Sequence, residues 1–341
     1  MVNKKGVIEV QFNWIFVLII GAIILLFFSV IILRQKDISE ISTSDLILKN
    51  LEAIFSGAEV SLGTVNSVNI PKIKIDFSCN EYRIGKVPRQ INVMSMFTPK
   101  SIESSKLITW TLDWSLPYRV TNLLYLTSPQ IRYVFVGDSD FTKNIFNSMP
   151  NETKRDIYNG VGGIKNKGDN QVRIVFFDNY AGNGASIPSD FEDMKKGAIS
   201  ALNVVDNGAK EDKGTLEFFD IVDNKFSNKQ TSYYIRKSTL LGAIFADDFE
   251  IYECVMKNSF KKLNIISQVY EDKTNDLSDF YSSQGNPACT SPHDEASGII
   301  NNIKTASGSF NSANVNSIDS YAKSLESKNK DAQLSSCAMI Y

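Results

Sequence analysis

One uninterrupted apolar stretch near the N-terminus, Trp14–Leu33 (WIFVLIIGAIILLFFSVIIL), dominates the hydrophobic pattern of the chain. It carries no charge, and only Gly21, Ala22 and Ser29 separate its large apolar side chains. A helix of this length extends about 30 Å, the thickness of the hydrocarbon core of a bilayer. The pattern therefore predicts a single transmembrane helix, running from Trp14 through Gly21 to Leu33, after a short tail of residues 1–13.

Residues 34–60 follow a different pattern, in which apolar side chains such as Leu48, Leu51 and Phe55 alternate with acidic and polar ones. The spacing predicts a juxtamembrane amphipathic helix that serves as a stalk or as a lid on the following domain. Ser61–Asn69 is rich in Ser, Gly, Thr and Asn and is typical of a linker.

The alternation of strand and helix patterns over residues 70–248 predicts an α/β domain with a mostly parallel sheet and flanking helices. Nearly continuous apolar runs at Ile131–Gly137 and Gln171–Asp178 are typical of strands covered on both faces. Helices are expected at Ser139–Met149 and, after the capping box Ser189-x-x-Glu192, up to Asn207-Gly208. The remaining expected strands are 73–77, 82–84, 106–114, 216–222, 233–236 and 240–245.

Residues 249–341 predict a C-terminal helical layer packed on that domain. The helix expected at about 248–270 has apolar side chains on two faces, which indicates that it lies between two layers. Ser291-Pro292 is a favourable helix start, and a last helix is expected at 313–330.

Composition narrows the function classes only slightly. The chain has 36 basic and 38 acidic side chains and a net charge of −2, which argues against a nucleic-acid partner. Four cysteines without a C-x-x-C pair fit two disulfides outside the cytoplasm, and buried free thiols are the alternative. Together with the short N-terminus, they favour an orientation with the N-terminus inside and the C-terminal domain outside the cell membrane.

The opening residues also carry two resemblances. Lys4-Lys5-Gly6, the early Glu9 and the apolar helix resemble an archaeal class III signal sequence of the type IV pilin kind, which implies cleavage after Gly6. Glu9 follows that glycine by three residues rather than five, and Gln11 and Asn13 are polar where a pilin helix is usually apolar. The stretches GVIEVQFNWIFVLIIGAIIL and Ile108–Pro129 are similar to an uncharacterised single-pass membrane-protein family of small-genome (DPANN-type) archaea, which implies no activity.

Acidic residues follow several expected strands. Because ligands bind at the carboxyl ends of parallel strands, converging carboxylates there would suit Mg²⁺ or Ca²⁺. The candidate metal ligands are Asp138, Asp140, Asp178, Asp220 and Asp247.

Two further features suggest sites of other kinds. Trp110, Trp114 and Arg119 form the densest aromatic patch, either as core or as a ligand platform. The loop Tyr180–Gly184 has the position of a phosphate-binding loop but lacks its third glycine. The cysteine pairing expected from the chain order joins Cys254 or Cys289 to Cys337, because the latter two flank the C-terminal helices.

These patterns support a leading hypothesis and two alternatives. The leading one is a membrane-anchored, outward-facing binding or scaffold protein without a catalytic role, whose partner is another membrane or surface protein. The first alternative is a metal-dependent α/β enzyme that uses the strand-end aspartates. The second is a type IV pilin-like surface subunit.

Overall fold

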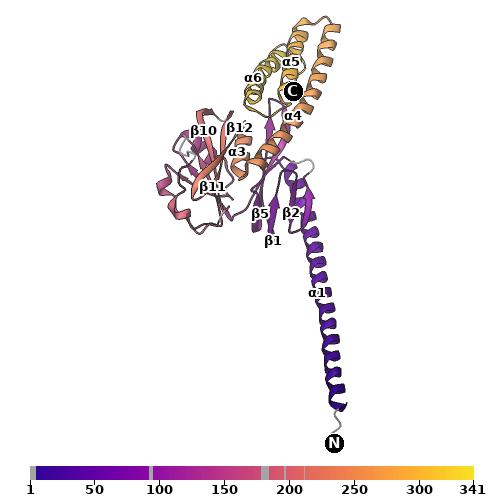
Figure 1. Cartoon of the computed structure of the whole chain (residues 1–341). Coiled ribbons are helices and arrows are strands. Elements are labelled where there is room, and N and C mark those ends of the chain that lie inside the picture. Colours follow the sequence, from indigo (N-terminus) through magenta and orange to yellow (C-terminus); the bar gives the residue numbers. More distant parts are fainter. Residues whose placement is uncertain (1–4, 92–94, 178–183, 196, 211) are drawn as a thin grey trace.

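The chain forms a mixed α/β structure with two six-stranded sheets and six α-helices in its described part (Figure 1). The computed structural model describes the backbone of residues 5–91, 95–177, 184–195, 197–210 and 212–341, and within these ranges it leaves the side chains of 5–17, 30–41 and 206–210 undescribed. The helices are α1 (Lys5–Val60), α2 (Asp140–Ser148), α3 (Lys237–Phe245), α4 (Phe249–Ser283), α5 (Pro287–Ala306) and α6 (Ser312–Leu334).

Sheet A has the strand order β3-β2-β1-β5-β6-β4 and is antiparallel except for the parallel pair β4–β6. Its long central pair, β1 with β5, keeps register from Val65↔Trp110 to Asp76↔Ser101, with one irregularity between Asn69 and Ile73. Its strands are β1 (Val65–Phe77), β2 (Glu81–Ile84), β3 (Val87–Gln90), β4 (Ser95–Phe97), β5 (Ser101–Ser115) and β6 (Arg119–Thr127).

Sheet B has the order β12-β11-β10-β9-β7-β8, in which β8, β7, β9 and β10 are parallel and β11 and β12 are antiparallel. The prediction of one mostly parallel sheet is therefore wrong, since both sheets are mixed. Its strands are β7 (Ile131–Val136), β8 (Lys154–Tyr158), β9 (Gln171–Phe176), β10 (Ile199–Lys210), β11 (Lys213–Val222) and β12 (Lys225–Ile235).

Two local predictions fail for identifiable reasons. The segment after Ser189 forms a short 3₁₀ turn and then strand β10 rather than a helix, because Gly197 has a positive φ of 82° and the following run pairs with β9. Residues 240–245 lie in helix α3, where every side chain from Ser238 to Phe245 is buried. An apolar run of this kind has no period that separates helix from strand.

Two elements also begin at other residues than predicted. Strand β1 begins at Val65, inside the stretch expected to be a linker. Helix α5 begins with Pro287 at its first turn, and Pro292 lies inside it.

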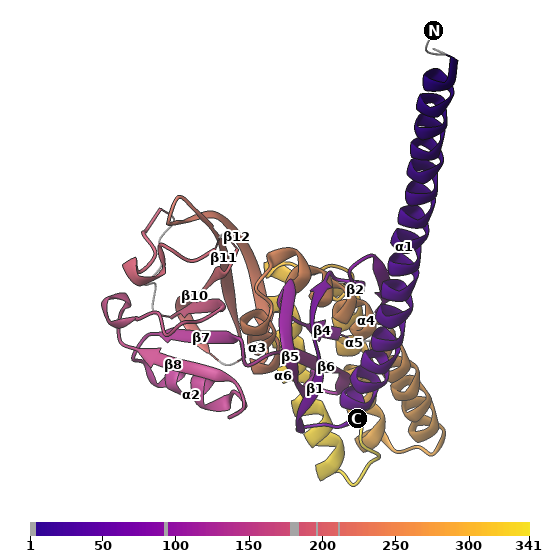
Figure 2. The same ribbon diagram turned by 90° about the horizontal axis from the view of Figure 1, so that it is seen from below.

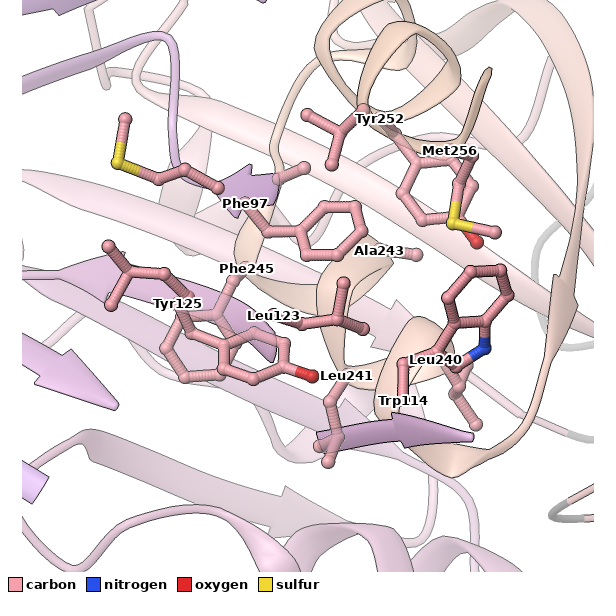
Figure 3. Close-up of a cluster of buried hydrophobic side chains, with 14 of the residues drawn as sticks. Phe97, Trp114, Leu123, Tyr125, Leu240, Leu241, Ala243, Phe245, Tyr252 and Met256 are labelled. Atoms are coloured by element: carbon pink, nitrogen blue, oxygen red, sulfur yellow. The ribbon is translucent and has the colours of Figure 1, made fainter. Parts of the chain in front are cut away.

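The largest core lies where sheet A, helix α3 and the first half of α4 meet (Figure 3). Phe97 of β4 stacks on Tyr125 of β6 and on Tyr252 of α4, with ring centroids 5.9 and 5.6 Å apart. Gly242 lies directly against the Phe97 ring, and a Cβ at this position would come within 2.6 Å of it. Glycine therefore allows α3 to approach β4 closely. The opposite face of sheet B has its own smaller apolar cluster, which contains Val134, Ile174 and Phe191.

Candidate functional site

Helix α1 is one continuous helix whose C-terminal part docks on sheet A (Figures 1 and 2). Leu48, Leu51 and Phe55 are fully or almost fully buried there. The Phe55 ring meets the Tyr82 ring of β2 edge-on at 5.3 Å. The Thr111 hydroxyl of β5 donates a 2.7 Å hydrogen bond to the carbonyl of Ala58 at the end of the helix. This contact ties the end of the helix to the sheet and so fixes the direction in which α1 leaves the domain.

The part of α1 toward the N-terminus projects away from the sheets (Figure 1). Large apolar side chains on it are exposed, with exposed fractions between 41% for Ile20 and 70% for Leu18. In the described residues, no helix has both the length and the apolar character needed to cross a membrane. Within the predicted span, the structure does not describe the side chains of residues 14–17 and 30–33, which include Trp14 and Leu33. It does describe Gly21.

Two disulfides link segments that are distant in sequence. Cys79, just after β1, bonds to Cys254 of α4, with Cα atoms 5.8 Å apart. Cys289 of α5 bonds to Cys337 in the C-terminal tail, with Cα atoms 5.6 Å apart. The tail is therefore bonded to Cys289, one of the two partners expected for it. The sequence argument left out Cys79 because it is far from α4 along the chain, but the fold brings the end of β1 against this helix.

The predicted metal ligands do not converge. Asp138 and Asp140 are exposed at the carboxyl end of β7, and Asp220 on β11 accepts a hydrogen bond from Asn228 Nδ2. Asp247 lies between α3 and α4, beside the amino-terminal half of β9, so it is at the opposite end of the parallel strands. Asp178 and residues 180–183 of the candidate phosphate loop lie outside the described residues. Among the described residues, no group of three His, Cys, Asp or Glu side chains could hold a metal ion.

The tryptophans do not form an exposed platform. Trp114 is fully buried, and its indole N–H donates a 3.1 Å hydrogen bond to the Ile235 carbonyl. Trp110 is 7% exposed and packs 5.0 Å from the Tyr125 ring, measured between centroids. Arg119 is exposed, and its guanidinium donates a hydrogen bond to the side-chain oxygen of Asn122 on the same strand. The two tryptophans belong to the core, because Trp110 packs on Phe245 of α3 and Trp114 on Phe260 of α4.

An open polar cleft of about 960 Å³ lies between the two sheets and is here called the inter-sheet cleft. Its position follows from the fold, because the β1–β5 pair of sheet A meets the amino-terminal ends of the parallel strands of sheet B there. Gln171 Nε2 donates to the Ser101 carbonyl at 3.2 Å and so joins the two walls. Hydroxyl and amide side chains line it, namely Ser101, Ser104, Ser105, Gln130, Asn170 and Gln171.

Charges of both signs complete the lining of the inter-sheet cleft. Three lysines and three acidic residues line it as well, namely Lys72, Lys74, Lys195, Glu103, Asp169 and Asp193, and Lys74 is the cross-strand neighbour of Glu103. Asp169 is neutralised by Arg132 and Lys154, in a network that also ties Arg132 to Asp156. Burial opposes ionisation of Asp169, but its hydrogen bonds to Lys154 and Arg132 prevail and keep its pKa below the usual value. The cleft is therefore polar and close to neutral.

The buried Arg173 and the half-buried Asp247 lie at the inner end of the inter-sheet cleft, where Arg173 Nη1 donates a 3.4 Å hydrogen bond to the backbone carbonyl of Asp247. A space of about 10 Å³, enough for about one water molecule, shares Gln171, Gly197 and Ala198 with the cleft and is also lined by Arg173 and Asp247. Arg173 is 2% exposed, and its guanidinium donates to the carbonyls of Ala243 and Ala246 at the end of α3, at 2.9 and 2.8 Å.

Burial shifts the pKa values of these two side chains in opposite directions. Burial lowers the pKa of Arg173 to about 10, and its Nε has no partner among the described residues. Burial also raises the pKa of Asp247 to about 6, although the Lys100 backbone N–H donates a 2.7 Å hydrogen bond to its carboxylate. The sequence alone indicates that Arg173 has a structural or functional role, because a charge inside the apolar run Val172–Phe177 needs a buried partner.

Asp247→Asn is expected to change how stability depends on pH. Because the pKa of Asp247 is higher in the folded state than in the unfolded chain, this group adds stability as the pH falls from about 6 toward 4. The variant cannot take up that proton. Relative to wild type, it should therefore be less stable at pH 4.5 than at pH 7.5, by a difference on the order of 1–3 kcal/mol.

Denaturant unfolding at the two pH values measures this difference. Asp138→Asn serves as the control, because Asp138 is exposed and lies outside the cleft. Equal effects of Asp247→Asn at both pH values would contradict the prediction.

Comparisons of the chain with protein-family models, with curated proteins and with solved structures find no match. The fold and the site therefore carry the functional argument alone. They define a two-sheet α/β domain on a projecting helix, with a polar cleft between the sheets.

Proposed function

We propose that the chain is a membrane-anchored binding protein whose α/β domain faces outward from the cell membrane and takes a polar ligand or partner surface in the inter-sheet cleft. The observation that carries the proposal is the division of helix α1. Its C-terminal part is buried against sheet A, while its N-terminal part leaves the domain with exposed apolar side chains. Lipid is the environment that suits the uncharged stretch of residues 14–33.

The two disulfides support the outward orientation. Disulfides persist in oxidising environments and are rare in the cytosol. All four cysteines are paired, which leaves no thiol of the chain free. A cytosolic domain of this size would not normally rely on two such bonds.

The cleft supports a binding role rather than a particular reaction. Its size is in the range of ligand sites, and its hydroxyl and amide groups both donate and accept hydrogen bonds. Because its charges cancel, a neutral or zwitterionic polar surface suits it better than a polyanion such as nucleic acid. The metal-enzyme alternative gains no support from Asp138, Asp140, Asp220 and Asp247, since these carboxylates lie apart.

A pilin-like subunit remains a second candidate, because α1 joins an exposed apolar end to a docked end in one helix. In such a subunit, the apolar end would pack against copies of itself as well as lipid. The deciding observation is the N-terminus of the mature protein. Cleavage after Gly6 favours this candidate, and an intact Met1 removes it.

Labelling with a membrane-impermeant lysine reagent tests the orientation. On intact cells, we expect modification of exposed domain lysines such as Lys165 and Lys257. Lys4 and Lys5 of the same chain serve as the internal control and should react only after lysis. The reverse pattern would overturn the outward-facing proposal.

A further inference from the structure

The turn between α2 and β8 contains the acceptor pattern for a covalent modification. Asn151-Glu152-Thr153 matches the N-x-[ST] acceptor pattern for N-glycosylation, in which the middle residue is not proline. No other asparagine of the 341-residue sequence is followed two positions later by Ser or Thr with a permitted middle residue. The pattern therefore singles out one position.

The local geometry presents the Asn151 side chain to solvent. Asn151 is exposed, and its Oδ1 accepts a 3.0 Å hydrogen bond from Arg155 Nη2. Arg155 also donates to the Met149 and Pro150 carbonyls, which fixes the turn around it. Within the described part of the chain, the amide nitrogen Nδ2 of Asn151 has no hydrogen-bond partner. This nitrogen is the atom that a glycan would join.

The site has room for a large substituent. Figure 2 shows α2 and β8 at the edge of sheet B, on the side of the molecule away from α1. A glycan at this edge would point into solvent, because β8 is the last strand of the sheet. It would contact neither the docked part of α1 nor the inter-sheet cleft, which none of residues 150–153 lines.

We propose that Asn151 is N-glycosylated, an inference that rests on the proposed outward orientation. The donor is a lipid-linked oligosaccharide activated by a phosphate or diphosphate. The Asn151 amide nitrogen forms a bond to C1 of the first sugar, and the bond from C1 to the phosphate oxygen breaks. The phosphate oxygen keeps the electron pair, and one amide proton is lost to a base. No group is oxidised or reduced.

The third residue of the pattern indicates when the transfer occurs. Thr153 is buried, and its hydroxyl donates a 2.6 Å hydrogen bond to the Pro150 carbonyl. The folded turn therefore hides the hydroxyl that the acceptor pattern requires. Transfer takes place before this turn closes, and the closed turn then holds the glycan outward.

Mass spectrometry of the full-length protein from its native membranes tests the proposal. Trypsin cleavage after Lys143 and Lys154 releases the peptide of residues 144–154. We expect this peptide to carry a glycan mass that fragmentation places on Asn151. Asn151→Gln and Thr153→Ala should lose the mass, and Thr153→Ser should keep it.

Asn147→Gln is the matched control, because Asn147 is an exposed asparagine of the same peptide with Met149 two positions later. It should keep the glycan. An unmodified wild-type peptide, or a glycan that persists in Asn151→Gln, overturns the inference. If the lysine reagent still labels the domain on intact cells, the proposed orientation survives that failure. If it labels only lysed cells, the proposed function fails instead.

Discussion

Trp114→Ala is expected to lower the free energy of unfolding by about 3–5 kcal/mol, which is the range for removing a large aromatic side chain from a core. The Trp114 ring is fully buried and stacks 6.0 Å from the Phe260 ring of α4, measured between centroids. Its loss leaves a cavity between sheet A and this helix. It also removes the indole hydrogen bond to the Ile235 carbonyl, which then keeps only its 2.9 Å hydrogen bond from the Thr239 hydroxyl.

Equilibrium denaturant unfolding of the purified full chain measures the effect. Trp114→Phe is the matched control, since it keeps an aromatic ring in the space and removes chiefly the hydrogen bond. Its expected cost is about 1–2 kcal/mol. A cost below about 1 kcal/mol for Trp114→Ala would contradict the packing described between β5 and α4.

The sequence predicts the elements whose apolar pattern has a clear period or a clear boundary. Strands β7 and β9 appear as short apolar runs between polar segments, and both form at the expected places. Helix α2 begins after Ser139, whose side chain caps the Thr142 N–H, and the helix ends before Pro150. Local physical chemistry sets these elements, so one sequence is enough to find them.

Other elements depend on tertiary contacts that the pattern does not contain. Residues 240–245 are apolar throughout, and only their position between the sheets makes them helical. The run that follows Gly197 has both faces buried by neighbouring elements, so it alternates too weakly to be recognised as strand β10. The sheet order is likewise missing from the pattern, since it depends on which distant strands pair.

The candidate site also has parts that the sequence predicts and parts that depend on tertiary contacts. Arg173 can be suspected from the sequence, because a cation inside an apolar strand requires buried acceptors. Its acceptors at Ala243 and Ala246 lie about seventy positions away and cannot be named without the fold. Asp247 was expected near the other aspartates, but the break between α3 and α4 places it beside Arg173 instead. The inter-sheet cleft itself is a product of how the two sheets meet.

Removing the Cys79–Cys254 disulfide by replacing both cysteines with serine is expected to destabilise the domain more than removing Cys289–Cys337. The first bond spans 175 positions and the second spans 48. In the chain-entropy account, such loops correspond to about 5 and about 4 kcal/mol, because the longer loop restricts the unfolded chain more. The first bond also joins sheet A to α4, whereas the second holds only the C-terminal tail on α5.

The two double variants, Cys79→Ser with Cys254→Ser and Cys289→Ser with Cys337→Ser, provide matched controls for each other. Denaturant unfolding should rank wild type above the tail variant, and the tail variant above the variant that lacks the sheet–helix bond. Addition of a reductant should destabilise wild type strongly and each variant only through its remaining bond. A larger loss in the tail variant would show that the tail and α5 support the core more than the long loop does. If reductant leaves wild-type unfolding unchanged, the bonds do not form in the isolated protein, and the main support for an outward-facing domain is lost.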